Sequence, residues 1–577
     1  MRNWREEEKR TFTASEDFKR NLEDGFRYVD KTELLIPLLR RDHEATFFLR
    51  PRRFGKTLTL SMIRYFVEDT RDEKLNAENR ELFQGMKIMN AGEKYIRQMT
   101  SYPVINLTLQ IVASDNMEHA MDLLVSVIQS VYQKKLYLLE ENRLNDPDRR
   151  FFQRIMYRKD ELGQEASQAD YVDSLRRLSE MLRKDAGKQA VVLIDEYDVP
   201  LEKAYQNGYY EEMVQVIGPM LQSVLKTNSD NLQFAVITGC LRIAKEGIYT
   251  GLNSPEVNTV LSHWGGDYIG FTETETRKLL DDSGVGDHFD QVKEWYDGYR
   301  FGNTVIYNPW SVIKHIEALN RAPDSPPLTY WANTSGNAII RDLAAHANEK
   351  QREQIESLLQ QGEITFSLRD NIVYNELFAD PDNVWNVMLS AGYLTATEFD
   401  GDMIRARIPN KEVFRIYRDQ IRGWFQETMK SFHVSELYLA MEQGNASEVE
   451  RILNEKFLSS MSYYDSAESF YHGVLLTLMQ LNEQFFCASN RESGDGRFDI
   501  MAKRKIAWDL AFVLEVKISE KDSDMMNDAR EGIAQILENQ YVKDLQREEY
   551  QKIMTYAVAF CRKRCRVIQG KTFSGSR

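Results

Sequence analysis

The stretch FFLRPRRFGKTLTLS, residues 47–61, places a basic turn between two apolar segments of different periodicity. The unbroken apolar run before the turn, ATFFLR at 45–50, predicts a buried strand, and the residues after the turn repeat at the spacing of an amphipathic helix. A strand that passes through such a turn into a helix presents backbone N–H groups to an anion. Lys56 can then reach the β- and γ-phosphates of a nucleotide, and the Thr57 hydroxyl can hold Mg²⁺. The sequence therefore predicts a phosphate-binding loop around Gly55.

This loop departs from the common pattern GxxxxGK[ST], which requires glycine at position 50, where the chain has Arg50. The tripeptide alone also fits a basic turn that caps a helix. A second copy, Gly570-Lys571-Thr572, is followed by only five residues, so we expect no helix and no phosphate site there.

Two further apolar runs end in polar residues that suit nucleotide chemistry. AVVLID at 190–195 ends at Asp195, which is expected to hold Mg²⁺, and Glu196 then polarises the attacking water. These acids also fit helix caps or a structural ion pair. LQFAVITG at 232–239 contains Thr238, which can sense the γ-phosphate, and Arg242 follows as a cation for the transition state. The predicted nucleotide-binding residues are Arg53, Phe54, Gly55, Lys56, Thr57, Asp195, Thr238 and Arg242.

Strand-like runs alternate with helical segments over the first part of the chain, where PVINLTL at 103–109 is a fourth strand. This alternation predicts a parallel α/β sheet. We expect a P-loop NTPase domain at 1–264, a mostly helical middle or lid domain at 265–445, and a small α/β domain at 446–577.

The composition excludes several other classes of protein. The 577 residues carry 74 Lys and Arg against 89 Asp and Glu, a net charge of −15, which excludes a uniformly basic DNA-coating protein. No apolar run approaches the roughly 20 residues that span a bilayer, and the first ten residues lack a signal-peptide core. Four scattered cysteines form neither a disulfide framework nor a CxxC zinc motif. We therefore expect a cytoplasmic protein with no membrane association.

The C-terminal region contains a second chemical pattern. In RFDIMAKRKIAWDLAFVLEVKI, Asp499 lies on one apolar strand, and Glu515 and Lys517 lie two apart on the next. Across a hairpin, two carboxylates can bind Mg²⁺ beside a lysine that activates hydroxide for attack on a phosphodiester. A solvated strand face also produces Glu-x-Lys, but here the neighbours are apolar, and unpaired charges among apolar neighbours are costly.

Flanking helices offer additional candidates for this site. Glu468 and His472 lie four apart on a predicted helix at 466–482, so Glu468 is a candidate third metal ligand, or one half of a surface pair. Gln535 and Tyr541 can contact a nucleic acid backbone, although polar residues in such a pattern more often simply face solvent. The basic run CRKRCR at 561–566 fits either phosphate contacts or a solvated charged face.

The ordered motifs resemble a bacterial family of AAA-ATPase-like proteins that carry a C-terminal PD-(D/E)xK nuclease-superfamily domain. The resemblance rests on YVDKT (28–32), RPRRFGKT (50–57), LIDEYDVPL (193–201), ITGCLRIAKEGIYTGLN (237–253), WYDGYRFG (295–302), YWANTSGN (330–337) and ESGDGRFDI…EVKI. It implies an AAA-like domain, a restriction-endonuclease-like C-terminal domain, ATP and Mg²⁺ as cofactors, and Arg50 as a family trait. Carried across, Lys56, Thr57, Asp195, Glu196 and Thr238 match the nucleotide site. Glu468, Asp499, Glu515 and Lys517 match the nuclease site, with Phe498-Asp499 in place of Pro-Asp.

Two functions fit these patterns. The first is an ATP-dependent enzyme whose P-loop module is coupled through the lid to a Mg²⁺-dependent DNase, which by analogy suits mobile-element or phage-defence work. The second is a nucleotide-controlled switch or scaffold whose C-terminal domain binds nucleic acid without cutting it. Both make nucleic acid, with DNA favoured, the partner of the C-terminal domain, and both are compatible with a homo-oligomer.

Overall fold

The computed structural model describes most of the chain, in two compact units. The described residues are 15–140, 143–241, 255–331, 340, 343, 348–359, 361–369, 380–430, 434–458, 468–480, 482, 484–493, 496–505, 509–538, 542–548, 550–562 and 564–574. Unit 1 comprises Met1–Gly336 with Glu363–Ile416, and unit 2 comprises Asn337–Gly362 with Tyr417–Arg577. No helix among the described residues is both long and apolar enough to cross a bilayer.

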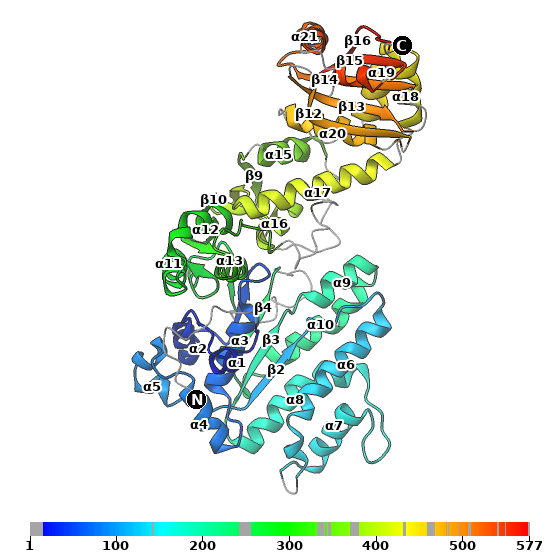
Figure 1. The fold of residues 1–577 in the computed structure, drawn as a ribbon. Helices are drawn as coiled ribbons and strands as arrows, with labels where there is room; N and C mark the ends of the chain where they lie inside the picture. The colour runs from blue at the N-terminus through cyan, green and yellow to red at the C-terminus, as the bar shows by residue number, and fades with distance from the viewer. Residues whose placement is uncertain are drawn as a thin grey trace. The chain divides into compact units, whose positions relative to one another are not determined.

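Unit 1 is organised by a five-stranded parallel sheet (Figure 1). Its spatial order is β2 (Val104–Thr108), β3 (Ala190–Asp195), β4 (Leu232–Gly239), β1 (Ala45–Leu49) and β5 (Glu256–Asn258). The expected parallel α/β sheet is thereby confirmed, with β5 added at the β1 edge. Because every pairing is parallel, the carboxyl ends of β1, β3 and β4 meet at one edge. That edge holds the polar residues which end the apolar runs.

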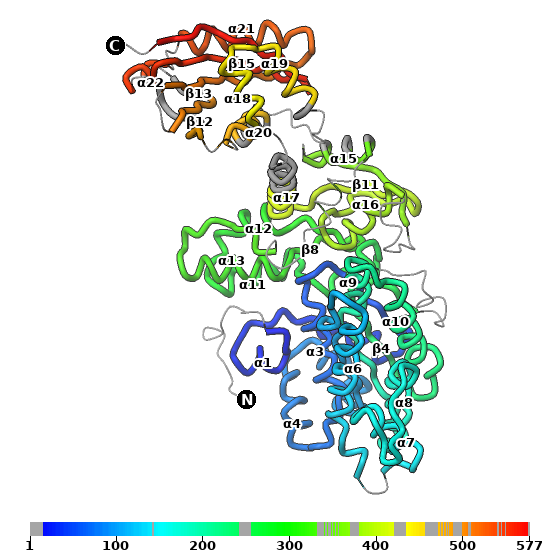
Figure 2. The backbone as a smooth tube through the Cα atoms, turned by 90° about the vertical axis from the view of Figure 1, so that its right-hand side faces the viewer, coloured from blue at the N-terminus to red at the C-terminus, as the bar shows by residue number. Residues whose placement is uncertain are grey.

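Helices cover both faces of this sheet. On one face, alternate strand residues such as Phe47 and Ile194 pack with α6 (Met117–Gln133), α8 (Gln168–Ala186) and α10 (Tyr210–Leu225). Helix α3 (Lys56–Val67) contacts β3 and β4, and α8 and α10 lie side by side (Figure 2). Full burial of each large aliphatic or aromatic side chain contributes about 1.5–3 kcal/mol. The sheet is therefore held rigidly enough to position side chains at its edge.

The rest of unit 1 is built mainly from short helices. Before β5 they are α1 (Phe18–Glu23), η2 (Thr32–Leu34), α2 (Leu35–Arg40), α4 (Glu73–Glu81), η3 (Lys87–Asn90), α5 (Glu93–Ile96), η4 (Leu136–Leu139), α7 (Asp146–Tyr157) and α9 (Val199–Asn207). The later ones are α11 (Glu273–Asp282), η5 (Gly286–His288), α12 (Phe289–Tyr296), α13 (Pro309–Arg321) and α16 (Pro381–Ser390). The middle of the chain is thus helical, as expected.

Two small sheets accompany these middle helices. One has the order β6 (Phe271–Thr272), β8 (Thr304–Tyr307), β7 (Tyr299–Phe301). The other has the order β10 (Thr395–Phe399), β11 (Met403–Arg407), β9 (Ile364–Ser367). Strands of two to five residues are too short for a period-2 pattern to stand out, so the sequence did not indicate them.

Unit 2 contains a mixed five-stranded sheet in sequence order: β12 (Phe485–Ser493), β13 (Gly496–Arg504), β14 (Leu510–Ile518), β15 (Lys552–Cys561) and β16 (Arg564–Gln569). Among the described strands of this sheet, only β14 and β15 pair in parallel, and α21 (Met525–Glu538) is the longer of the two helices between them. The other described helices of unit 2 are α15 (Glu349–Leu359), α18 (Val434–Glu442), α19 (Ala446–Arg451), the π-helix Ile452–Leu458, α20 (Glu468–Gln480) and α22 (Lys543–Arg547). Helix α17 (Lys411–Lys430) begins in unit 1 and ends in unit 2. This arrangement confirms the expected small α/β domain.

The basic run at 561–566 begins at the last residue of β15 and reaches into β16, and Lys563 lies outside the described residues. Arg564 pairs with Asp522 at 3.0 Å, and Arg566 pairs with Glu450 at 2.5 Å. Both arginines are exposed, so this run resembles a solvated charged face.

Arg50, at the position where a glycine would complete the loop pattern, is fully buried and points into the protein. Its guanidinium donates to the carbonyl oxygens of Leu49 and Asn258, each at 3.1 Å, and to the Asn258 side chain. It also lies over the ring of Phe301, 4.6 Å from the centroid. Burial lowers the pKa of Arg50 to about 9. Arg50 therefore ties β1 to β5 behind the loop.

We predict that Arg50→Ala destabilises unit 1 by about 3 kcal/mol, because the buried carbonyls and the Asn258 amide lose their donor. Urea denaturation followed by tryptophan fluorescence measures this change. Arg40→Ala is the matched control, because Arg40 pairs with Asp42 at the surface, and it should change the midpoint little. Equal midpoints for the two variants would contradict a structural role for Arg50.

Candidate functional site

The loop at 50–55 joins β1 to α3 and requires unusual backbone angles. Gly55, directly before α3, has φ 94°, a value that glycine adopts without strain. Arg53 has φ 69°. Lys56 and Thr57 are the first two residues of α3. The backbone N–H groups of this first turn are therefore available to an anion.

Asp195 connects three elements at the edge of the sheet. Its Oδ2 accepts a hydrogen bond from the Thr57 hydroxyl at 2.6 Å, and its Oδ1 accepts one from the Thr238 hydroxyl. Burial raises the pKa of Asp195, as does the nearby Glu196. The structure thus brings together the predicted residues of β3, β4 and α3.

A hydroxyl and a carboxylate in direct contact at the start of α3 form the donor set that Mg²⁺ prefers beside phosphates. A cavity of about 500 Å³ reaches Thr57 and Asp195 from the side of β2 and α6. Mg²⁺ usually keeps several water ligands, and this cavity provides room for them. The residues present therefore fit a magnesium ion.

Lys56 is buried beneath the loop and holds it together. Its Nζ donates to the carbonyl oxygen of Arg50 at 3.0 Å and lies 3.4 Å from Glu196 Oε1. Burial alone would lower the pKa of Lys56, but the nearby Cys240, Glu196 and Asp198 outweigh it and raise the pKa. Burial also raises the pKa of the Cys240 thiol to about 12, so that thiol is neutral at pH 7 and the carboxylates supply the field. Lys56 is therefore fully charged.

Glu196 has φ 52°, a left-handed conformation that is uncommon for a residue with a side chain. Its backbone N–H donates to the Thr238 hydroxyl at 3.4 Å. Strained backbone of this kind gathers at functional sites. In this conformation the Glu196 carboxylate lies beside Lys56 rather than in solvent.

Tyr197 and Asp198 fix the backbone that leaves β4, a role that the sequence analysis did not assign. Asp198 Oδ2 accepts from the N–H groups of Cys240 and Leu241 at 2.7 and 2.9 Å. The Tyr197 hydroxyl donates to the Leu241 carbonyl at 2.5 Å. Burial raises the pKa of Asp198 to about 6. The second aspartate in Asp-Glu-Tyr-Asp was the available signal. Arg242, the predicted cation, lies outside the described residues.

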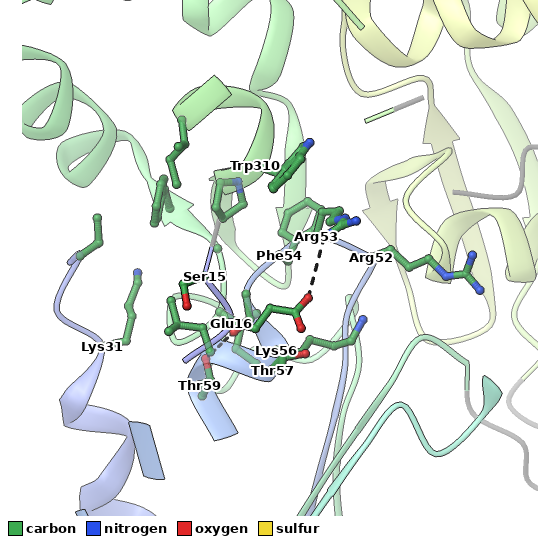
Figure 3. Close-up of a pocket in the computed structure, with 18 of the residues that line it drawn as sticks. Ser15, Glu16, Lys31, Arg52, Arg53, Phe54, Lys56, Thr57, Thr59 and Trp310 are labelled. Atoms are coloured by element: carbon green, nitrogen blue, oxygen red, sulfur yellow. Dashed lines mark hydrogen bonds and ion pairs between the residues drawn. The ribbon is translucent and has the colours of Figure 1, made fainter. Parts of the chain in front are cut away.

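A cavity of about 330 Å³ opens above the loop (Figure 3). Lys56, Thr57 and Glu196 line its polar part. Its apolar part is lined by Tyr28, Val29, Phe271, Leu279, Trp310 and Ile313. Such a pocket suits a flat nucleobase and a ribose. The sequence analysis missed this part because its residues lie far from the loop along the chain.

The middle segment, which we define as residues 265–336 and 363–410 of unit 1, contacts each residue from Pro51 to Phe54. The Trp331 indole donates to the Arg52 carbonyl at 3.2 Å, and the Arg53 guanidinium lies 4.6 Å from the ring centroid of Trp310. Phe54 packs against Tyr299 and Phe301, and Gly392 leaves space that a Cβ would take from Pro51. The loop is therefore shaped from both sides, by its own sheet and by this segment.

Glu412 extends this contact network into α17. Fully buried, it accepts from the Ser311 hydroxyl at 2.8 Å and from the Trp331 N–H at 2.9 Å. Burial raises the pKa of Glu412 to about 7. Trp331 thus contacts two groups. Its indole bonds to the loop, and its backbone N–H bonds to the Glu412 carboxylate.

The C-terminal candidates gather where β13 and β14 separate. Their ladder ends at Ile500↔Leu514, and beyond it Asp499 Oδ2 accepts from the Val516 N–H at 2.8 Å. The buried Glu515 lies one residue before Val516, and Lys517 Nζ lies 3.3 Å from Glu515 Oε1. Asp499, Glu515 and Lys517 therefore lie near the ends of the two strands, and two carboxylates beside a lysine offer the oxygen ligands that Mg²⁺ prefers.

Two helices support this place. Lys517 Nζ donates to Gln535 Oε1 of α21 at 2.5 Å, so Gln535 contacts the predicted catalytic lysine. His472 of α20 lies with Nε2 2.7 Å from the Asp499 carbonyl oxygen. Glu468 is the first residue of α20, one turn before His472, but its side chain lies outside the described part of the structure, as does Tyr541. Among the described residues, no group of three or more His, Cys, Asp or Glu side chains could hold a metal ion.

Comparison with known proteins agrees with this architecture. Residues 13–249 match the family model described as "Predicted AAA-ATPase", and residues 466–570 match the PD-(D/E)XK nuclease superfamily. The resemblance inferred from the motifs is thereby confirmed. A relative from Azotobacter chroococcum mcd 1, described as "Uncharacterized protein in vnfD 5'region", is 25% identical over 400 residues. The match covers 68% of this chain and 65% of that relative, so the chain spans slightly less than two-thirds of the relative's length.

The buried Glu412 predicts a pH dependence of stability. Its pKa of about 7 in the folded protein lies above the usual value of 4.5, so its contribution to stability is complete below pH 4.5 and is lost as the pH rises through 7. Glu412→Gln should remove about 3 kcal/mol of this pH-dependent loss. Urea denaturation at pH 5 and pH 8 measures the difference between wild type and variant.

The control is Glu93→Gln, because Glu93 pairs with Arg97 at the surface. Its stability should follow wild type at both pH values. If Glu412→Gln also parallels wild type, Glu412 does not titrate in this range.

Proposed function

We propose that this protein binds and hydrolyses ATP with Mg²⁺ in unit 1 and cleaves DNA with a metal-dependent site in unit 2. The observation that carries the ATPase proposal is the convergence of Thr57, Asp195 and Thr238 beside Lys56 and Glu196. Magnesium supplies charge neutralisation between the phosphates when bound. The family matches support the ATPase and nuclease classes.

Each residue of the ATP site then has a distinct role. The first turn of α3 and Lys56 bind the β- and γ-phosphates, which compete with the loop carbonyls for the Lys56 ammonium. As Lys56 turns toward the phosphates, Glu196 loses its ion pair and can accept a proton from the attacking water. Thr238 holds Asp195 in place and faces the terminal phosphate. The apolar part of the cavity takes the base.

In unit 2, Asp499 and Glu515 hold the metal, and Lys517 lies beside them to orient or activate the nucleophile. Gln535 fixes the Lys517 ammonium through its amide oxygen. A carboxylate from Glu468, one helical turn before His472, is the proposed third ligand. The intact acid–acid–lysine set favours cleavage over the alternative, a nucleotide-controlled switch or scaffold with a non-cleaving, nucleic-acid-binding unit 2.

The ATP site is tested by two substitutions. Lys56→Ala should weaken ATP binding at least about 100-fold, because no other residue replaces its charge under the phosphates. Glu196→Gln should bind ATP as wild type does but hydrolyse it at least about 100-fold more slowly, since the amide cannot accept the proton. Calorimetry measures binding, and phosphate release measures hydrolysis.

The chain provides its own control for the first substitution. Lys571 belongs to the second Gly-Lys-Thr, and residues 571–574 form no helix. Lys571→Ala should leave ATP binding unchanged. Unchanged affinity in a folded Lys56→Ala protein would overturn the loop assignment.

The nuclease site is tested with linear, circular and single-stranded DNA, with Mg²⁺ or Mn²⁺ and with and without ATP. Asp499→Ala and Glu515→Ala should abolish cleavage, and Lys517→Ala should slow it about 100-fold with little change in metal affinity. Lys503→Ala is the control, because Lys503 of β13 pairs with Glu548 at 2.6 Å. All these variants should hydrolyse ATP at the wild-type rate.

The same assay tests whether ATP bound in unit 1 changes the rate of DNA cleavage by unit 2. Glu196→Gln, which retains ATP, should cut DNA at a different rate from wild type when ATP is present and at the same rate without it. Full-rate cleavage by Glu515→Ala would show that the nuclease site is misassigned and would favour the scaffold.

A further inference from the structure

Arg52 of the loop lines the cavity together with Lys56, Thr57 and Glu196. It pairs with Glu202, with Nη2 and Oε2 2.5 Å apart, and its side chain is 31% exposed. Its backbone is anchored because its carbonyl accepts from the Trp331 indole. Arg52 is thus fixed at its main chain and keeps access to the cavity at its guanidinium.

Arg52 differs from its neighbour Arg53 in the side of the loop that it occupies. Arg53 lies over Trp310, in the apolar part of the cavity, and its closest carboxylate, Glu16, is 3.9 Å away. In Figure 3 the Lys56 and Arg52 side chains extend to the same side of the loop, away from Trp310. Burial would lower the pKa of Arg52, but Glu202, Cys240, Asp198 and Glu196 raise it. Arg52 therefore lies in the field of the carboxylates that follow β3.

The partner of Arg52 comes from the helix that directly follows the predicted catalytic carboxylates. Glu202 lies on α9, and its N–H donates to the Asp198 carbonyl at 2.9 Å. Lys56 and Arg52 are thus each paired with a carboxylate of this region, Lys56 with Glu196 and Arg52 with Glu202. Phosphate oxygens bind a guanidinium in the same forked geometry as a carboxylate and carry more charge.

The γ-phosphate is the group that Arg52 can meet. Glu196 is positioned to accept a proton from the attacking water, and that water must lie beyond the γ-phosphorus, opposite the leaving ADP. A cation on the Glu196 side of the loop therefore acts on the terminal phosphate rather than on the β-phosphate at the start of α3.

We propose that Arg52 binds the γ-phosphate of ATP and stabilises the charge that develops on it, and that Glu202 competes with this phosphate for Arg52. This inference rests on the proposed ATPase function and adds a catalytic residue to it. In the step concerned, the water oxygen bonds to the γ-phosphorus and the bond to the β,γ-bridging oxygen breaks. That bond's electron pair leaves with ADP, and the water proton passes to Glu196. Arg52 donates hydrogen bonds throughout and keeps its charge.

The test compares two nucleotides that differ in the terminal phosphate: ADP and the non-hydrolysable β,γ-imido analogue of ATP, each with Mg²⁺ and the full chain. Arg52→Ala should weaken the analogue about tenfold and ADP less than about twofold. Glu202→Gln should tighten the analogue about threefold and leave ADP unchanged. Arg52→Lys should fall between Ala and wild type, because lysine keeps the charge and loses the fork. The rate of ATP hydrolysis by Arg52→Ala should fall about 100-fold.

The double variant Arg52→Ala/Glu202→Gln isolates the competition. In the absence of Arg52, Glu202→Gln should no longer affect the analogue. Glu93→Gln controls for the loss of one surface carboxylate and should match wild type. If a variant with Ala at position 52 fails to fold, Arg52→Lys and Glu202→Gln still give the analogue-to-ADP ratio.

Three outcomes would overturn the inference: equal losses for ADP and analogue in Arg52→Ala, weaker analogue binding in Glu202→Gln, or a Glu202→Gln effect that persists without Arg52. The first two would make Arg52 and Glu202 a structural pair. None of them affects the proposed ATPase, which fails instead if wild type binds neither nucleotide or if Lys56→Ala binds both normally.

Discussion

The Asp195 carboxylate joins the parts of unit 1 that must act together. One of its oxygens accepts from Thr57 at the start of α3, and the other accepts from Thr238 on β4. Because this carboxylate is buried, each of its hydrogen bonds constrains geometry more strongly than it would in water. The loop, β3 and β4 therefore share one fixed point, and Glu196 is held immediately beside it. A cation and a triphosphate would meet groups whose positions are already set, which reduces the cost of ordering them on binding.

The loop itself is held by interactions that its short sequence does not suggest. Arg50 anchors it to β5 from inside, the Trp331 indole binds the Arg52 carbonyl, and aromatic rings enclose Phe54. Through Trp331 and Glu412 the same network reaches the first residues of α17. A change in the loop would therefore alter hydrogen bonds of Trp331 and Glu412, which lie some 280 to 360 residues later in the chain. The contacts that shape the loop therefore depend on the same buried hydrogen bonds that hold Trp331 and Glu412.

In unit 2, as in unit 1, side-chain hydrogen bonds fix the candidate site at the ends of strands. Its acids and lysine lie where β13 and β14 separate, so backbone groups that no longer pair are bonded by side chains, as Asp499 does for Val516. Gln535 and His472 come from two helices that pack against this place and contact Lys517 and the Asp499 carbonyl. The charged residues are therefore enclosed among apolar strands yet supplied with partners, which is the condition under which buried charges are tolerated. Both units place their candidate site residues where a strand ladder or a sheet edge ends.

The amino-acid sequence by itself determined the parallel sheet, the loop with Lys56 and Thr57, the acids after β3, and the acid–acid–lysine set of unit 2. These features are local: apolar runs, helical spacing and short motifs record them within a few residues. The tertiary structure alone decided that Arg50 is a buried anchor, that Arg52 pairs with Glu202, and that Tyr28 and Trp310 face the same cavity. It also revealed β5, β16 and the small sheets of the middle segment, whose strands are too short to show a period. Contacts between residues hundreds of positions apart leave no local pattern, because burial and hydrogen bonding act on distances in space rather than along the chain.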